Sequence, residues 1–321
     1  MKYSYCGKSG LQLPLISLGL WHNFGFADNY ETAREMIIYA FEQGITHFDL
    51  ANNYGPPPGS AESNFGRILK ENLSSHRDEM IISSKAGHLM WEGPYGDGSS
   101  RKQLMASINQ SLKRTGLDYF DIFYSHRFDP FTPIEETMQA LVDIVRAGKA
   151  LYVGISKYPP EEARLAMRYL MDSDVPCLIF QDKYSMFNRQ PEQEILGLTR
   201  EFGSGFIAFS PLAQGLLTDK YLHGIPEYSR AADPAGFLQR EQVSSMLVEK
   251  VTKLNEVASN RGQSMAEMAL SWALRDEGVT SLIVGARNVD QLEENLVALD
   301  NISFTQEELL QIDQILDGAT L

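Results

Sequence analysis

The stretch that decides the fold is residues 101–126, RKQLMASINQSLKRTGLDYFDIFYSH, in which a helical pattern runs into a strand pattern. Arg101–Thr115 repeats its apolar residues at helical spacing, and Gly116 follows as a C-cap residue. Phe120–His126 is a short apolar run typical of a buried strand. Runs of this kind that alternate with helical segments indicate βαβ units and a parallel sheet.

The same alternation continues on both sides of this unit. Eight such units in 321 residues fit a closed (β/α)8 TIM barrel better than an open doubly wound sheet, which the pattern alone leaves open. No GxGxxG follows the first strand, so a Rossmann fold loses its main support. The predicted strands are Leu15–Leu20, Thr46–Ala51, Met80–Ser84, Phe120–His126, Ala150–Ile155, Leu178–Gln181, Phe206–Phe209 and Ser281–Val284, and the helical segments include Glu31–Gln43, Ala61–Asn72 and Ile134–Ala147.

Three segments interrupt the alternation. Gly7–Leu13 is predicted to belong to an N-terminal β-hairpin that plugs the bottom of the barrel. Gly87–Ser100 is rich in Gly and carries Trp91, and Leu212–Arg240 is a long loop after strand seven. Long loops in compact domains are usually functional or disordered. Because no linker or low-complexity tract is found, we expect one domain over residues 1–321.

Composition limits the class of protein. Hydrophobic residues make up 43% and charged residues 22%, as in soluble globular proteins, and the net charge of −14 argues against nucleic-acid binding. Cys6 and Cys177 are far apart, and the six histidines form neither HxH nor HExxH, so we expect no disulfide framework and no metal. We find no signal peptide and no membrane span, which predicts a cytoplasmic protein.

Polar side chains gather at the ends of three consecutive predicted strands. Asp49 ends the second strand, Lys85 the third and His126 the fourth, and Tyr54 follows in the loop after Asp49. Alone, each has an ordinary explanation as a helix cap, a solvated charge, a structural histidine or a packing aromatic. Together they indicate an active site, because such sites lie at the C-terminal ends of barrel strands.

Carbonyl reduction is the chemistry that fits these four side chains. Hydride addition develops negative charge on oxygen, so a proton donor is needed, and a phenol with a pKa of about 10 is a weak acid. We expect the Lys85 ammonium to lower the pKa of Tyr54, and Asp49 to hold Lys85 in place. His126 would orient the carbonyl oxygen.

The sequence around Asp49 resembles the aldo-keto reductase signature, and the resemblance covers essentially the whole chain. It implies the catalytic tetrad Asp49, Tyr54, Lys85 and His126, with Tyr54 as the acid and NADPH as the cofactor. The residues that carry it are 44–55 (GITHFDLANNYG), Glu62 and Gly66 in 61–66 (AESNFG), Ser84-Lys85 and Ser125-His126.

The resemblance also implies a cofactor site. Ser156 and Gln181 would hydrogen-bond the nicotinamide carboxamide, and Phe209 would stack on its ring. The family usually has Asn after that Ser, so the role of Lys157 is open. Arg287, at the start of a helix, matches the 2′-phosphate site, although it could be a solvent-exposed charge. The implied set is Gly19, Trp21, Asp49, Ser156, Lys157, Gln181, Phe209, Ser210, Pro211, Leu212, Ala213, Gln214, Gly215, Lys220, Arg230, Gly285, Arg287, Gln291, Glu294 and Asn295.

A closer resemblance, carried by residues 17–25 (SLGLWHNFG), 52–62 (NNYGPPPGSAE) and 123–127 (FYSHR), is to a bacterial branch of the family related to potassium-channel β subunits. It implies small aldehyde or ketone substrates, such as glyceraldehyde 3-phosphate or methylglyoxal, and a homo-oligomer (tetramer or octamer). Arg127 could bind a substrate phosphate or form a surface ion pair. The residues expected to line the substrate mouth are Trp21, Tyr54, Trp91 and His126.

Two other functions remain open at this point. A Schiff-base aldolase or lyase could use Lys85, but such a lysine needs a lowered pKa and Asp49 would raise it. A catalytically weak NADP(H)-binding regulatory subunit would resemble the channel β subunits. Those relatives differ at the position of His126, so His126 favours turnover.

Overall fold

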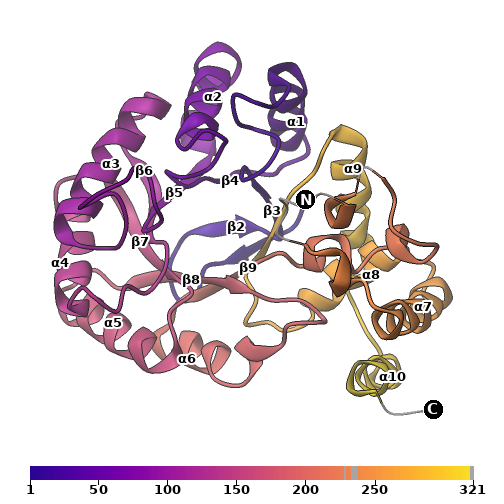
Figure 1. The fold of residues 1–321 in the computed structure, drawn as a ribbon. Helices are drawn as coiled ribbons and strands as arrows, with labels where there is room; N and C mark the ends of the chain where they lie inside the picture. The colour runs from indigo at the N-terminus through magenta and orange to yellow at the C-terminus, as the bar shows by residue number, and fades with distance from the viewer. Residues whose placement is uncertain (228, 233–237, 319–321) are drawn as a thin grey trace.

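The eight apolar runs form eight parallel strands that close into a barrel, with helices around the outside (Figure 1). The computed structural model describes residues 1–227, 229–232 and 238–318. Neighbours around the barrel follow the order β10-β3-β4-β5-β6-β7-β8-β9, which confirms the predicted (β/α)8 fold. The barrel strands are β3 (Ile16–Gly19), β4 (His47–Asp49), β5 (Ile81–Ala86), β6 (Phe120–Ser125), β7 (Ala150–Ser156), β8 (Cys177–Lys183), β9 (Gly205–Phe209) and β10 (Ser281–Val284).

The helices pack their apolar faces on the outside of the barrel. In α3 the Ser100 hydroxyl accepts a hydrogen bond from the backbone N–H of Gln103, and Gly116 ends the helix in a left-handed conformation, as its sequence predicts. The segment predicted as one helix over Ala61–Asn72 is divided, because a π-helical turn at Leu69–Leu73 follows α2. The helices are α1 (Tyr30–Glu42), α2 (Ser60–Ile68), α3 (Arg101–Thr115), α4 (Ile134–Arg146), α5 (Pro160–Asp172), α6 (Ile195–Phe202), α7 (Ser245–Asn260), α8 (Met265–Ala273), α9 (Val289–Val297) and α10 (Gln306–Asp317).

The N-terminal hairpin closes the bottom of the barrel. β1 (Tyr3–Tyr5) pairs antiparallel with β2 (Gln12–Pro14), so the predicted hairpin is confirmed. Buried Cys6 and Leu13 pack with Ile122 and Ile207 of the barrel interior. Both cysteines are free and buried.

Strand alternation separates the barrel interior from the layer beneath the helices. Ile81 and Tyr124 belong to the interior cluster, whereas Ile82 and Phe123 belong to the cluster that includes the helices. With the strand period of two, Lys85 shares the inward face of β5 with Ile81. The Lys85 side chain, near the end of β5, therefore points to the barrel axis.

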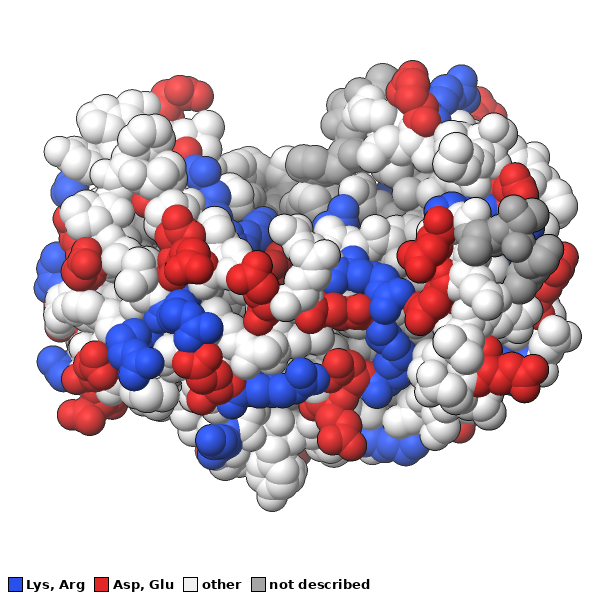
Figure 2. Space-filling model, turned by 90° about the horizontal axis from the view of Figure 1, so that it is seen from below, with Lys and Arg blue, Asp and Glu red and all other residues white. Residues whose placement is uncertain are grey.

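The long loop after β9 lies beside the open end of the barrel and has a small core of its own. Tyr221, Ala231 and Leu238 form this buried cluster. Positions 228 and 233–237 of the predicted 212–240 loop lie outside the described residues. No described helix is long and apolar enough to cross a membrane. The face in Figure 2 shows Lys and Arg interspersed with Asp and Glu.

Candidate active site

A cavity of about 940 Å³ opens where the barrel strands end. This volume is at the upper end of the range of ligand pockets, so it is large enough for a dinucleotide together with a small substrate. Its walls come from strand ends, the loop after β9 and the start of α9. Its lining includes Gly19, Trp21, Asp49, Tyr54, His126, Lys157, Gln181, Phe209, Ser210, Pro211, Leu212, Gln214, Gly215, Lys220, Arg230, Gly285, Arg287, Gln291, Glu294 and Asn295.

A buried ion pair lies at the base of the cavity. The Lys85 ammonium donates to Asp49 Oδ2 at 2.5 Å and to the carbonyl oxygen of Leu50 at 2.7 Å, and its side chain is fully buried. Burial lowers the pKa of Lys85, and the Asp49 carboxylate opposes that shift. An unpaired ammonium would be costly here, so Asp49 is what allows a charged lysine at this place.

The Tyr54 ring lies directly over this pair. Lys85 Nζ is 5.0 Å from the centroid of the Tyr54 ring, and the rings of Trp21 and His126 flank it at 6.3 Å and 6.0 Å. Burial, followed by the Asp49 carboxylate, raises the pKa of Tyr54 well above its ordinary value. This is opposite to the direction expected from the sequence. Burial is the larger cause, and the Asp49 carboxylate that pairs with Lys85 adds to it.

His126 is neutral in this environment. Burial, followed by the nearby Lys85 charge, lowers the pKa of His126 well below its ordinary value. Its ring meets that of His88 edge-on at 4.4 Å, and its buried Nδ1 has no hydrogen-bond partner in the described part of the chain. A neutral imidazole above the Tyr54 ring can donate one N–H to a polar group in the cavity.

A second buried carboxylate supports the strand that carries Lys85. Glu62 accepts hydrogen bonds from the Ser84 hydroxyl at 2.6 Å and from Arg114 Nε at 2.6 Å. Ser84 points away from the barrel interior, so this contact ties β5 to α2 and α3. The motif residue Glu62 therefore acts from outside the cavity.

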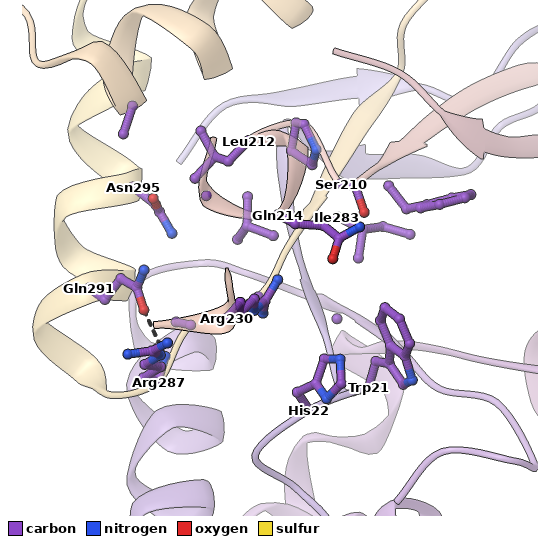
Figure 3. A pocket seen from close by; sticks show the side chains of 18 of the residues that line it. Trp21, His22, Ser210, Leu212, Gln214, Arg230, Ile283, Arg287, Gln291 and Asn295 are labelled. Carbon is purple, nitrogen blue, oxygen red and sulfur yellow. Dashed lines mark hydrogen bonds between the residues drawn. The ribbon is translucent and has the colours of Figure 1, made fainter. Parts of the chain in front are cut away.

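The far end of the cavity carries three cations. Burial is the main cause that lowers the pKa values of Lys220 and Arg230, and repulsion from Arg287 lowers both further. For Lys220, the nearby Asp219 carboxylate raises the pKa, but by less than Arg287 or Arg230 lowers it. Figure 3 shows Arg230 beside Arg287, with Gln291 and Asn295 along α9. Gln291 Oε1 accepts from the Arg287 backbone N–H at 2.9 Å. Such a cluster favours a polyanionic ligand.

The buried polar atoms near the cavity that the described residues leave unsatisfied include Ser156 Oγ and Asn295 Nδ2. Buried polar groups are normally hydrogen-bonded, so these atoms fit a ligand with complementary groups. Gln181 instead donates to Asp49 Oδ1 at 3.2 Å. Lys157 adopts a positive φ of 54°, and its ammonium lies 5.3 Å from the centroid of the Phe209 ring.

Five predicted residues do not line the cavity, and Lys85, which is fully buried beneath it, is one of them. Ser156 and Ala213 are buried beside it. Trp91 is 38% exposed in the loop after β5. Arg127 Nη2 donates to both carboxylate oxygens of Asp97, at 2.8 and 2.9 Å, and its Nε donates to the carbonyl oxygen of Gly87. The ion-pair alternative for Arg127 is the one found.

Several lining residues were not predicted. His22 directly follows predicted Trp21, Asn53 directly precedes predicted Tyr54, and His88 lies two residues beyond β5, so a search just past the strand ends could have found them. The contribution of α8 through residues 264–267 has no local signal, because that segment follows another helix. Among the described residues, no group of His, Cys, Asp or Glu is arranged to hold a metal ion.

This fold and these strand-end residues define the class of protein. Residues 15–317 match the Aldo/keto reductase family, and the chain belongs to this family of oxidoreductases, which use nicotinamide cofactors.

Similar proteins point to one branch of the family. The chain is 57% identical over 324 residues to L-glyceraldehyde 3-phosphate reductase of Escherichia coli O157:H7, covering 99% of this chain and 93% of that protein. It is 56% identical, with the same coverage, to L-glyceraldehyde 3-phosphate reductase of Escherichia coli strain K12. A probable voltage-gated potassium channel subunit beta of Oryza sativa subsp. japonica is 34% identical, over 97% of this chain and 94% of that protein.

Proposed function

We propose that this chain uses NADPH to reduce the aldehyde group of L-glyceraldehyde 3-phosphate to an alcohol. The observation that carries the proposal is that predicted catalytic residues and a cluster of cations lie in the same cavity. One end holds Tyr54 and His126 above the buried Lys85–Asp49 pair, and the other end holds a cation cluster suited to phosphates. The relatives named L-glyceraldehyde 3-phosphate reductase support the substrate.

The residues present fit NADPH. Lys220, Arg230 and Arg287 would face its phosphates, which would also relieve their mutual repulsion. Ser156 and Asn295 would supply the polar atoms that the rest of the chain leaves unsatisfied. When bound, NADPH supplies the hydride for the carbonyl carbon.

Tyr54 is the proton donor in this proposal. The phenol is protonated at neutral pH, as a general acid must be, but burial raises its pKa and makes it a weaker acid, so its proton transfer depends on stabilisation of the phenolate. As negative charge develops on the substrate oxygen, the phenol transfers its proton to that oxygen. The Lys85 ammonium, 5.0 Å from the ring centroid, then stabilises the phenolate that remains. Neutral His126 orients the carbonyl oxygen by donating a hydrogen bond.

The substrate end of the cavity offers a cation for the phosphate of a triose. Lys157 lines the cavity together with His88, and burial followed by the charge of Lys85 lowers the pKa of Lys157. Arg127 is committed to Asp97, so it is the weaker candidate. We assign the contact with the substrate phosphate to Lys157.

The structure does not favour Schiff-base chemistry at Lys85. Its nitrogen is fully buried and donates to two oxygen acceptors, so it is neither exposed nor a free nucleophile.

The proposal is tested by following NADPH oxidation at 340 nm with glyceraldehyde 3-phosphate, methylglyoxal and an aromatic aldehyde in parallel. We expect kcat/KM to be highest for the phosphorylated triose. NADPH oxidation without a preference for glyceraldehyde 3-phosphate would indicate a reductase that acts on another substrate. Tight NADPH binding without oxidation of any aldehyde would overturn the proposal in favour of a regulatory subunit.

A further inference from the structure

A row of hydrogen-bonded side chains crosses the barrel interior and ends on Asp49. Ser281 Oγ lies 2.7 Å from Ser17 Oγ, which lies 2.9 Å from His47 Nδ1. On the other side of the ring, His47 Nε2 lies 3.0 Å from Ser83 Oγ, and the Ser83 hydroxyl donates to Asp49 Oδ1 at 2.7 Å. The row spans the four adjacent strands β10, β3, β4 and β5.

The direction of every hydrogen bond in this row follows from its last acceptor. A carboxylate can only accept, so the single hydroxyl proton of Ser83 is used on Asp49. Ser83 Oγ must therefore accept from His47, which fixes the Nε2–H tautomer. His47 Nδ1 then accepts from the Ser17 hydroxyl, and Ser17 Oγ accepts from Ser281. All four donors point toward Asp49.

The environment of the ring agrees with this assignment. His47 is fully buried, and burial lowers its pKa to about 4, so the ring carries one proton at neutral pH. Ser17, Ser83 and Ser281 are also fully buried. Hydrogen bonds that run in one direction polarise one another, which strengthens the last donor of the row.

The row explains how Asp49 is held. Its Oδ2 accepts from Lys85, while Oδ1 accepts from Ser83 at 2.7 Å and from Gln181 at 3.2 Å. Without the Ser83 hydroxyl, Asp49 Oδ1 would keep only the longer hydrogen bond from Gln181. The carboxylate could then rotate and carry the Lys85 ammonium away from the Tyr54 ring.

We propose that His47 and Ser83 are positioning residues that fix the Asp49 carboxylate, and through it the Lys85 ammonium, beneath Tyr54. The proposal rests on the proposed reductase function. An error of about 1 Å in the placement of a catalytic group can cost about a hundredfold in rate. Loss of the row should therefore lower kcat without changing the affinity for NADPH.

The test compares single and double variants by NADPH oxidation at saturating aldehyde. We expect Ser83→Ala and His47→Phe each to lower kcat about tenfold or more, with the Kd of NADPH unchanged. Because both act through one hydrogen bond, the double variant should be no slower than the slower single variant. His47→Gln keeps a donor toward Ser83 and should recover most of the rate.

Ser204→Ala is the control, because Ser204 is a buried serine whose hydroxyl donates to the carbonyl oxygen of Cys177 at 2.6 Å, where β8 begins and away from Asp49. Its kcat should stay near that of the wild type. Unchanged kcat in Ser83→Ala, or losses that multiply in the double variant, would overturn the proposal. Should His47→Phe fail to fold, Ser17→Ala is used in its place.

Nitrogen NMR of histidine-labelled protein without cofactor tests the row independently of turnover. The His47 signals, assigned with His47→Gln, should show the Nε2–H tautomer at neutral pH. An Nδ1–H tautomer or a doubly protonated ring would refute the row itself. If the wild-type protein shows this tautomer but oxidises no NADPH with any aldehyde, the proposed function is refuted, while the hydrogen-bonded row is still supported.

Discussion

Replacing Arg287 with Ala tests how the cavity selects its cofactor. Arg287 is exposed at the start of α9 and faces Arg230 and Lys220 across the cavity. A hydrogen bond to a charged group contributes about 1.5–3 kcal/mol. Because Arg287 is exposed, we expect its hydrogen bond to the 2′-phosphate of NADPH to contribute about 1.5 kcal/mol, the lower end of this range. A loss of about 1.5 kcal/mol corresponds to about tenfold weaker binding of NADPH. NADH lacks the 2′-phosphate, so its affinity should change little.

The same substitution should not weaken the fold. Removing one of three mutually repelling cations relieves repulsion in the free protein, so the midpoint of thermal unfolding should stay the same or rise. The assay is a fluorescence titration of both cofactors at low and at high salt. Arg164→Ala is the control, because Arg164 is an exposed arginine paired with Glu201 on the outer helices. Equal losses for NADPH and NADH would refute the reasoning.

Three further predictions follow from the site. Tyr54→Phe removes the phenol proton, so kcat should fall about 10²- to 10⁴-fold with NADPH affinity retained, and near-normal turnover would exclude Tyr54 as the donor. Lys157→Met should raise KM for glyceraldehyde 3-phosphate about tenfold but leave KM for glyceraldehyde unchanged, whereas equal changes would contradict a phosphate contact. His47 titrates at about 4 when folded and at 6.5 as its ordinary value, so its stabilising contribution is complete above pH 6.5 and is lost as the pH falls toward 4. When the pH is lowered from 7 to 5, the free energy of unfolding of the wild type should fall by about 2 kcal/mol more than that of His47→Gln, as measured by urea unfolding. The same fall in both proteins would contradict this prediction.

The barrel was predictable because buried parallel strands leave continuous apolar runs between amphipathic helices. The C-terminal ends of the strands were harder to place. β5 continues past the predicted end at Ser84, because Lys85 and Ala86 still pair with β6. β4 is shorter than predicted and stops at Asp49. At β5, polar residues interrupt the apolar run without interrupting the ladder, whereas at β4 the apolar residues Leu50 and Ala51 follow after the strand has ended.

Strand periodicity alone could place only those site residues that lie on the strands. Strand alternation places His47 and Asp49 on the same face of β4, and Ser83 and Lys85 on the same face of β5. Which hydroxyl meets which ring nitrogen depends on how adjacent strands are staggered, and the sequence does not contain that information. For Arg127 the sequence left two alternatives open, a substrate phosphate and a surface ion pair. Its place next to His126 suggested a substrate contact, but Asp97, thirty residues earlier, binds it.

The fate of the hydride tests the central claim most directly. NADPH carrying two deuterium atoms at C4 of the nicotinamide is incubated with the protein and glyceraldehyde 3-phosphate, and the product is analysed by mass spectrometry. Reduction at the Tyr54 site predicts glycerol phosphate with one deuterium on the former aldehyde carbon. Unlabelled glycerol phosphate, or tightly bound NADPH with no product, would contradict it.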